Sequence, residues 1–176
     1  DTINIERARR IITTPTNIYI TTGLGVLKKF DAKSLQLTKE GNMNNVAIEA
    51  KDMIITPDNK YLIIQNTERT ISALNTYTDS ILYTIPDHDF ATSGIAISHK
   101  GTEFATAGLD GTIHLYETIT GKRKATIHFP NNIEPFIVDD ENHYLASKNT
   151  LEAIKISYND NVYSYDQFDV QLNRPD

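Results

Sequence analysis

A segment of about 42 residues recurs four times along the chain, and this repeat limits the possible folds more than any other feature. The copies are recognised at four turn sequences, which lie at Thr14, Thr56, Ser98 and Val138. An aromatic residue follows each turn, and successive aromatic residues are 42, 43 and 40 positions apart at Tyr19, Tyr61, Phe104 and Tyr144. A fixed period of roughly 20 to 50 residues is typical of solenoids, propellers and other repeat arrays.

Each copy contains four short apolar runs separated by polar turns. In the third copy these runs include Ile95–Ile97, Ile113–Tyr116 and Ala125–Phe129. The runs have the length of strands, the gaps between them carry Gly, Asn, Asp or Pro, and helical periodicity is nowhere sustained. We therefore predict an all-β fold, a β-propeller of four-stranded antiparallel blades with about four blades present. The expected blades span residues 1–42, 43–86, 87–129 and 130–176.

The third copy also carries two hairpin signals in succession. Asp110-Gly111 lies between its second and third runs, and Thr120-Gly121 lies between its third and fourth. A tight hairpin needs positive φ at its centre, which glycine adopts without a steric penalty. Both glycines are therefore expected at the centres of turns.

Composition and charge exclude several classes of protein. Hydrophobic residues make up 39% of the 176 residues and charged residues 23%, which predicts a folded globular chain. The net charge of −6 argues against direct binding of nucleic acid. With no apolar run near 18 residues we expect no membrane span. The absence of cysteine excludes disulfides and thiolate metal sites.

The third copy resembles the WD40-repeat family. His88 precedes the run Ile95–Ile97 at the family's distance, and Thr106 and Asp110 stand where the family has its hydroxyl and its aspartate. Tyr116-Glu117 replaces the family's Trp-Asp pair. The resemblance implies a buried hydrogen-bonded group of His88, Thr106, Asp110 and Tyr116 that braces the blade.

The resemblance also implies a ring of about seven blades. The chain, which begins at Asp1 without an initiator Met, is then expected to be a segment of a larger protein in a multi-subunit assembly. Residues 55–66 (ITPDNKYLIIQN) are in addition similar to YVTN-type propellers of bacterial surface and periplasmic proteins. This second similarity leaves the subfamily open.

Other candidate sites are better explained as structural or solvated residues. The five histidines (His88, His99, His114, His128 and His143) lack paired metal-ligand spacing. Asp139–Glu141 occupies a turn rather than a calcium loop, Lys122–Lys124 follows another turn, and no helix pattern follows Gly23–Gly25. We therefore expect no metal, no cofactor and no enzyme activity.

Two functions remain open at this point. The leading hypothesis is an intracellular, non-enzymatic scaffold that binds other proteins, with no small-molecule ligand indicated. Its partners would contact the loops that join second to third strands and one blade to the next, where the candidate contact residues are Arg69, Phe90, Asn66 and Leu109. The alternative is a secreted or periplasmic YVTN-type propeller with a ligand or enzyme site at its central channel.

Overall fold

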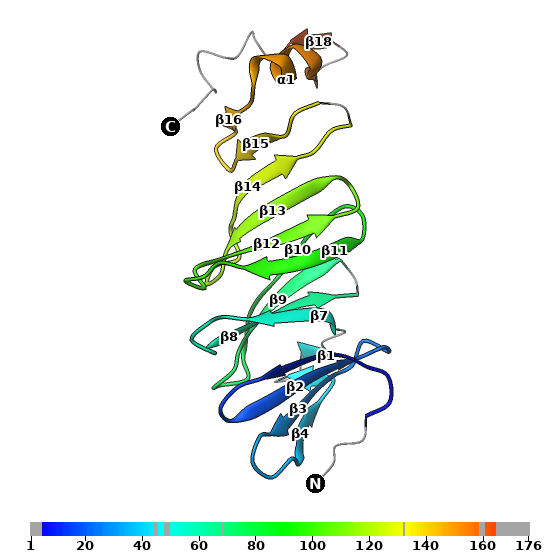
Figure 1. Ribbon diagram of the computed structural model, residues 1–176, viewed down its shortest axis with the longest axis vertical. Coiled ribbons are helices and arrows are strands. Elements are labelled where there is room, and N and C mark those ends of the chain that lie inside the picture. Colours follow the sequence, from blue (N-terminus) through cyan, green and yellow to red (C-terminus); the bar gives the residue numbers. More distant parts are fainter. Residues whose placement is uncertain are drawn as a thin grey trace.

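Three antiparallel sheets, two of four strands and one of six, follow one another along the long axis of the molecule (Figure 1). The structure is a computed structural model that describes residues 5–43, 46–47, 50–67, 69–131, 133–158 and 161–164. The first sheet contains β1 (Ala8–Thr13), β2 (Asn17–Thr22), β3 (Leu27–Asp31) and β4 (Leu37–Glu40). The second contains β7 (Ala50–Ile55), β8 (Tyr61–Asn66), β9 (Thr70–Asn75) and β10 (Ile81–Pro86). The third begins with β11 (Thr92–Ile97), β12 (Glu103–Gly108), β13 (Thr112–Glu117) and β14 (Arg123–His128).

The predicted all-β fold of four-stranded antiparallel blades is confirmed by these sheets. A small strand pair, β5 (Asn42–Met43) with β6 (Val46–Ala47), lies in the connection between the first two sheets. Among the described residues, no helix has the length and apolarity needed to cross a bilayer.

The spacing of the repeat is more regular at its first turns than at its aromatic residues. After the first strand of each copy, one backbone N–H closes the turn onto a carbonyl oxygen, and these N–H groups belong to Thr14, Thr56, Ser98 and Asp139. They are 42, 42 and 41 positions apart. Each first pair of strands also shifts register near its start, at Ala8/Arg10, Ala50/Asp52 and Thr92/Gly94.

The aromatic residues, in contrast, do not occupy one equivalent position. Phe104 pairs with Ile97 at the end of its first strand, where the second sheet places Leu62 opposite Ile55. Tyr61 is therefore one residue out of step with Phe104. The first turns differ in length, because the Thr14 N–H donates to Asn17 O whereas the Thr56 N–H donates to Tyr61 O. An alignment of the copies on their aromatic residues therefore does not superimpose equivalent strand positions.

The core lies between the sheets, and the central strand β8 is apolar on both of its faces. We call the face turned toward the preceding sheet the leading face and the opposite one the trailing face. The leading face of the second sheet, with Leu62, Ile64 and Leu74, packs against Tyr19 and Leu27 of the first sheet. Its trailing face carries Ile63, Ile71 and Ala73, which pack with Phe104 and Tyr116 of the third sheet.

Hydrogen bonds at the rim of the core repeat from one junction to the next. Tyr19 donates its hydroxyl to Thr76 O (3.4 Å), and Tyr83 donates to the equivalent Thr118 O (2.8 Å). Burial and the nearby carboxylates raise the pKa of both phenols, so they remain neutral donors. Each tyrosine therefore joins its own sheet to the last turn of the sheet that follows it in the chain.

The fourth copy does not form a four-stranded blade over the described part of residues 130–176. Its strands β15 (Phe136–Asp139) and β16 (Tyr144–Leu145) extend the third sheet beyond β14. The stacked rings of His128 and Phe136, 4.5 Å apart, support this pairing. A helix, α1 (Lys148–Ala153), and a hairpin of β17 (Lys155–Tyr158) with β18 (Asn161–Ser164) follow.

A helix cap explains the departure from the predicted blade. Ser147 has extended backbone angles, and its side chain accepts a hydrogen bond from Thr150 N (3.3 Å). A serine in this position satisfies a free N–H group of the first helical turn. Residues predicted to form a turn and a third strand therefore form a helix instead.

We expect Gly121→Ala to destabilise the fold. Gly121 has φ +69°, and a Cβ placed there would lie 2.8 Å from the Tyr83 ring of the preceding sheet. Both backbone strain and the contact oppose the substitution, so the free energy of unfolding should fall by about 1–3 kcal/mol. Urea denaturation measures the loss.

Gly94→Ala is the matched control, because a Cβ at Gly94 meets no atom within 4 Å. Its stability should stay within about 0.5 kcal/mol of the parent chain. Equal losses for the two variants would contradict the close contact between Gly121 and Tyr83.

Candidate functional site

A buried polar network joins the loop before β11 to the hairpin of β12 and β13. His88 lies on the loop, and its side chain is fully buried. Its Nδ1 lies 3.0 Å from Asp110 Oδ2 and 3.0 Å from Thr112 Oγ1, and its Nε2 lies 3.0 Å from Thr106 Oγ1. The network therefore ties the entry of the third sheet to its central strands.

Gly108 allows this close approach. A Cβ at Gly108 would lie 2.4 Å from both His88 Nδ1 and Asp110 Oδ1. Real Cβ atoms do not come so near, so the imidazole and the carboxylate meet over a backbone position that only glycine leaves open.

Asp87 forms the second centre of the network. Its Oδ1 accepts hydrogen bonds from Thr106 Oγ1 (2.8 Å) and Tyr116 OH (3.1 Å), and its Oδ2 accepts from Thr92 Oγ1 (2.7 Å). A hydroxyl has one proton to give, so when Thr106 donates to Asp87 it accepts from His88.

The carboxyl group of Asp87 stays ionised although its side chain is fully buried. Burial alone would raise its pKa, but hydrogen bonds involving His114, Thr92 and Thr106 and the nearby His88 hold it at about 2. Burial and the adjacent Asp87 raise the pKa of the Tyr116 phenol, which therefore remains a donor.

His114 completes the network from the same face of β13 as Tyr116. Its Nδ1 lies 3.1 Å from Tyr116 OH and 3.6 Å from Asp87 Oδ1. The rings of His88 and His114 stack 4.0 Å apart at an interplanar angle of 12°. The Phe104 ring stacks on the Tyr116 ring, with 5.0 Å between the two ring centroids.

The ligand-type atoms of Asp87, His88 and His114 lie within 4.8 Å of one another, which raises the question of a metal centre. A metal ion binds an imidazole along the nitrogen lone pair, in the plane of the ring. Two stacked, nearly parallel rings cannot both point a lone pair at one ion between them. This arrangement therefore does not fit a metal and instead suits a hydrogen-bonded brace.

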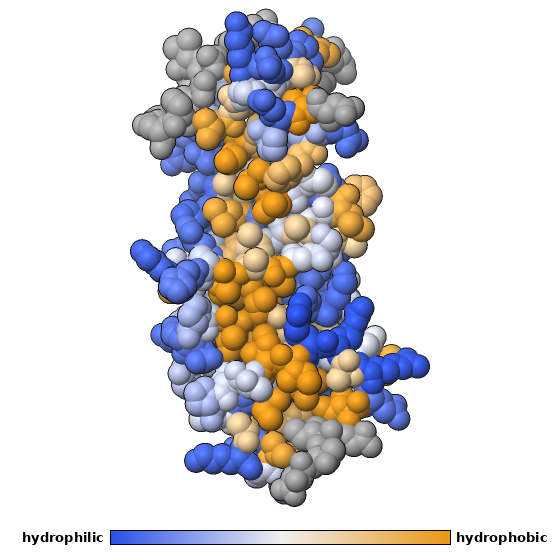
Figure 2. All heavy atoms as spheres, viewed as in Figure 1, coloured by the Kyte–Doolittle hydropathy of each residue, from blue (hydrophilic) through white to orange (hydrophobic). Residues whose placement is uncertain are grey.

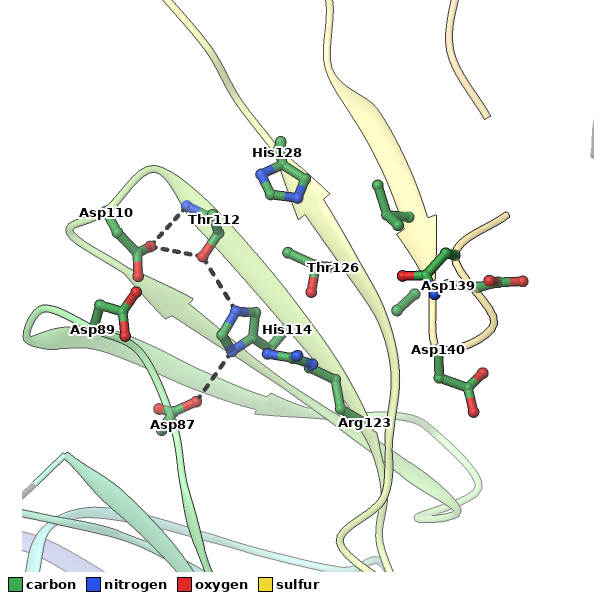
Figure 3. A pocket seen from close by; sticks show the side chains of 13 residues that line it. Asp87, Asp89, Asp110, Thr112, His114, Arg123, Thr126, His128, Asp139 and Asp140 are labelled. Carbon is green, nitrogen blue, oxygen red and sulfur yellow. Dashed lines mark hydrogen bonds and ion pairs between the residues drawn. The ribbon is translucent and has the colours of Figure 1, made fainter. Parts of the chain in front are cut away.

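A hollow of about 560 Å³ opens beside the network, over the leading face of β13, β14 and β15 (Figure 3). It exists because β15 extends the third sheet. Its lining includes Arg123, the imidazoles of His114 and His128, and five carboxylates from Asp87, Asp89, Asp110, Asp139 and Asp140. Burial and the nearby His114 lower the pKa of His128. The five carboxylates outnumber the guanidinium and the two imidazoles, so the hollow is negatively charged.

All four residues of the group predicted from the family resemblance lie in this network. His88 contacts Thr106 and Asp110 directly, and Tyr116 joins them through Asp87. Asp87, Thr112 and His114 also belong to the network and were not among the residues predicted for it. The alternation of side chains along a strand was the available signal, since it places Thr112, His114 and Tyr116 on one face of β13.

The four candidate partner contacts have different surroundings. Phe90 is 64% exposed and Leu109 is 72% exposed, on two loops joined by a hydrogen bond from Leu109 N to Ala91 O (3.0 Å). Arg69 is exposed beside them, and its guanidinium donates to Asp89 O. Asn66 is buried, and its amide nitrogen donates to Thr70 and Ser72, so it belongs to the interior.

The other residues set aside in the sequence analysis lie in turns and strands. Asp139 accepts hydrogen bonds from the backbone N–H groups of Glu141 and His143, as expected of a turn residue. Lys122 forms an ion pair with Asp140, and Lys124 forms one with Glu103 (2.5 Å). Gly25 has φ +81° in the turn between β2 and β3.

Comparisons with known proteins relate the chain to others by fold alone. No protein-family model matches it, and no curated protein matches its sequence. The structure of U3-55K matches with a TM-score of 0.64 at 16% identity, over 78% of this chain and 46% of that one. The WD40 repeats of RRP9 match with a TM-score of 0.63 at 15% identity, over 82% and 52% of the two chains.

A third match is the hydrazine synthase of Kuenenia stuttgartiensis, with a TM-score of 0.54 at 17% identity, over 73% of this chain and 45% of that one. The chain thus has a WD40-like propeller fold and spans about half the length of the solved chains it matches. Identities this low carry no conclusion about function.

We expect Asp110 and His88 to be energetically coupled. Asp110→Ala removes the carboxylate that lies 3.0 Å from His88 Nδ1 and accepts from the Thr112 N–H, which should cost about 1–3 kcal/mol in the free energy of unfolding. In a cycle of Asp110→Ala, His88→Ala and the double variant, the double loss should be smaller than the sum of the single losses. Additive losses would show that the contact contributes nothing beyond the hairpin turn.

We also expect Asp87 to make stability depend on acid pH. Its pKa is lowered from the ordinary 3.8 to about 2, so its ionised form stabilises the fold above pH 3.8, and this contribution is lost as the pH falls toward 2. Asp87→Asn should therefore cost about 2 kcal/mol or more at pH 7, and the difference from the parent chain should shrink between pH 4 and pH 2.

Urea denaturation across this pH range makes the measurement. Asp89→Asn, on the exposed part of the same loop, is the control and should leave the pH profile unchanged. A constant difference between Asp87→Asn and the parent chain from pH 7 to pH 2 would contradict the ionised state of Asp87.

Proposed function

We propose that this protein is a non-enzymatic scaffold that binds a partner protein through the loop end of its third sheet. The observation that carries the proposal is the pair of large apolar side chains exposed there, Phe90 and Leu109. They lie on neighbouring loops at one end of the third sheet. Phe90 is on the loop that joins β10 to β11, and Leu109 is on the turn between β12 and β13. Aromatic side chains such as that of Phe90 are enriched at protein–protein interfaces, and Leu109 adds apolar surface on the neighbouring loop.

The loop that carries Phe90 is held in place by the interior. Asp87, three residues before Phe90, is bonded to Thr92, Thr106 and Tyr116, and His88 is bonded to the β12–β13 hairpin. The Asp87 N–H also donates to Arg69 O (3.0 Å) on the neighbouring loop of the second sheet. Because the loop is already ordered, a partner would not have to supply the free energy of ordering it.

The charge next to these residues indicates the chemistry of the partner surface. Asp89 precedes Phe90, Asp110 follows Leu109, and both line the acidic hollow (Figure 3). Charge complementarity favours a partner that presents an apolar residue flanked by Lys or Arg. Such a surface would cover Phe90 and Leu109 and place its cation at the mouth of the hollow.

Site-specific photo-cross-linking in extracts of the source cells tests the proposal. A photoreactive phenylalanine analogue in place of Phe90, and separately in place of Leu109, should cross-link to the same protein. Tyr77 is the matched control position, because it is 71% exposed on a turn at the opposite end of the strands. Binding of the captured partner should weaken about tenfold or more on Phe90→Ala, and Tyr77→Ala should have no effect.

Two outcomes would contradict this function. One is cross-linking at Tyr77 but not at Phe90 or Leu109. The other is retention of full affinity by the doubly substituted Phe90→Ala, Leu109→Ala chain.

A further inference from the structure

Two opposite charges line the hollow beside the buried network without pairing with each other. The guanidinium of Arg123 and the carboxylate of Asp89 both belong to the lining. Among the described residues, neither side chain takes part in an ion pair or a hydrogen bond. The two charges therefore share one hollow but do not lie within contact distance of each other.

These two charges enter the hollow from opposite ends of strand β14. Arg123 is the first residue of β14, whereas its last residue, His128, pairs with the start of β13. Asp89 lies on the loop that joins β10 to β11, and this loop is hydrogen-bonded to the turn before β13. Figure 3 shows Asp89 on one side of His114 and Arg123 on the other. Five residue steps along a strand span about 17 Å between Cα atoms, so the ends of the hollow are well separated.

The carboxylates at the Arg123 end are engaged by other groups. Asp140 forms an ion pair with Lys122. Asp139 accepts hydrogen bonds from two backbone N–H groups, and its Oδ2 lies 3.0 Å from His143 Nδ1. Within the described part of the chain, the guanidinium of Arg123 is therefore left to pair with an anion in the hollow.

Apolar groups lie between the two charged ends. In the view of Figure 2, apolar side chains form a band along the stacked sheets. The hollow differs from this surface, because its apolar lining residues Ala125 and Val138 are flanked by charges. Ala125 lies on β14 between its two ends, and Val138 pairs with the neighbouring Thr126. A ligand that spans the hollow thus meets charge, a short apolar stretch and the opposite charge.

The buried side of the hollow also offers an acceptor without a donor. His114 is 7% exposed and lines the hollow. Because the carboxylate of Asp87 beside its Nδ1 is an acceptor, Nδ1 carries the proton in the neutral ring and Nε2 carries the lone pair. Among the described residues, Nε2 is within hydrogen-bonding distance only of Thr112 Oγ1, at 3.5 Å, and Thr112 donates its one proton to Asp110 (2.6 Å). A donor group in the hollow would satisfy this nitrogen.

We infer that the hollow binds a small zwitterion whose ammonium and carboxylate are separated by a short chain, the chemistry of ω-amino acids and short peptides. Its carboxylate pairs with Arg123, and its N–H donors face Asp89 and His114 Nε2. A dication would meet Arg123 and a dianion would meet the aspartates, so a ligand with both charges fits the lining best. The site uses neither Phe90 nor Leu109, so it does not rest on the proposed partner protein.

Isothermal titration calorimetry of the purified chain tests the inference. The probes are ε-aminocaproate and triglycine, which both carry a terminal ammonium and a terminal carboxylate separated by several atoms. At least one of them should bind about tenfold or more tightly than hexamethylenediamine and adipate, which each carry one sign of charge. Glycine, with its charges adjacent, should bind more weakly than the better probe. The tighter of the two probes identifies an ω-amino acid or a peptide as the ligand class.

Substitutions at the two ends separate the contributions of the charges. Arg123→Gln should weaken binding of the better probe about five- to tenfold and should strengthen binding of hexamethylenediamine. Asp89→Asn should weaken binding of both compounds. Lys33→Gln, on the exposed turn between β3 and β4, is the control and should bind like the parent chain. Circular dichroism verifies that each variant is folded.

Histidine ring resonances in NMR spectra locate the bound probe. His114 and His128 line the hollow, so their ring protons should shift when the probe is added, whereas those of His99, exposed on the turn after β11, should not. Three results would overturn the inference: no binding of either probe at up to about 10 mM, equally tight binding of hexamethylenediamine, or unchanged affinity in the folded Arg123→Gln and Asp89→Asn variants.

Discussion

The central strands of this protein need an apolar neighbour on each side. Leu62, Ile63 and Ile64 follow one another on β8, point alternately to the two faces of the sheet, and have no exposed surface. Burial of one such side chain is worth about 1.5–3 kcal/mol, and here it depends on contacts between sheets. A single sheet could not supply these contacts, so the stability of the fold depends on the junctions between sheets.

The period, the strand class and the glycine turns were predictable from the sequence because they depend on local signals. Gly111 and Gly121 have φ of +78° and +69°, as hairpin turns require. Register could not be predicted as well, since it depends on turn length, and the short turn after Thr14 shifts Tyr19 relative to Phe104. The fourth unit differs because Ser147 caps a helix where a repeat predicts another hairpin.

The candidate site was only partly predictable from the sequence. The spacing of His88, Thr106 and Asp110 matched a known pattern, whereas Asp87 and His114 belong to no pattern and were found through their contacts. Strand register places Thr106 and His114 where the second sheet has Ile64 and Ser72. The junction between the second and third sheets is therefore more polar than the one before it. Polar groups buried there must satisfy one another, which fixes their geometry more tightly than apolar packing would.

The same polar network connects the interior to the exposed loop. Asp87 is ionised and buried, so loss of one of its partners would leave a charge without compensation, at a cost far above that of an exposed hydrogen bond. The chain between Asp87 and Thr92 is held at both of its ends by this carboxylate. A displacement of Phe90 that pulled on the loop would have to disrupt the junction between the second and third sheets. The loop surface is consequently anchored to the core beneath it.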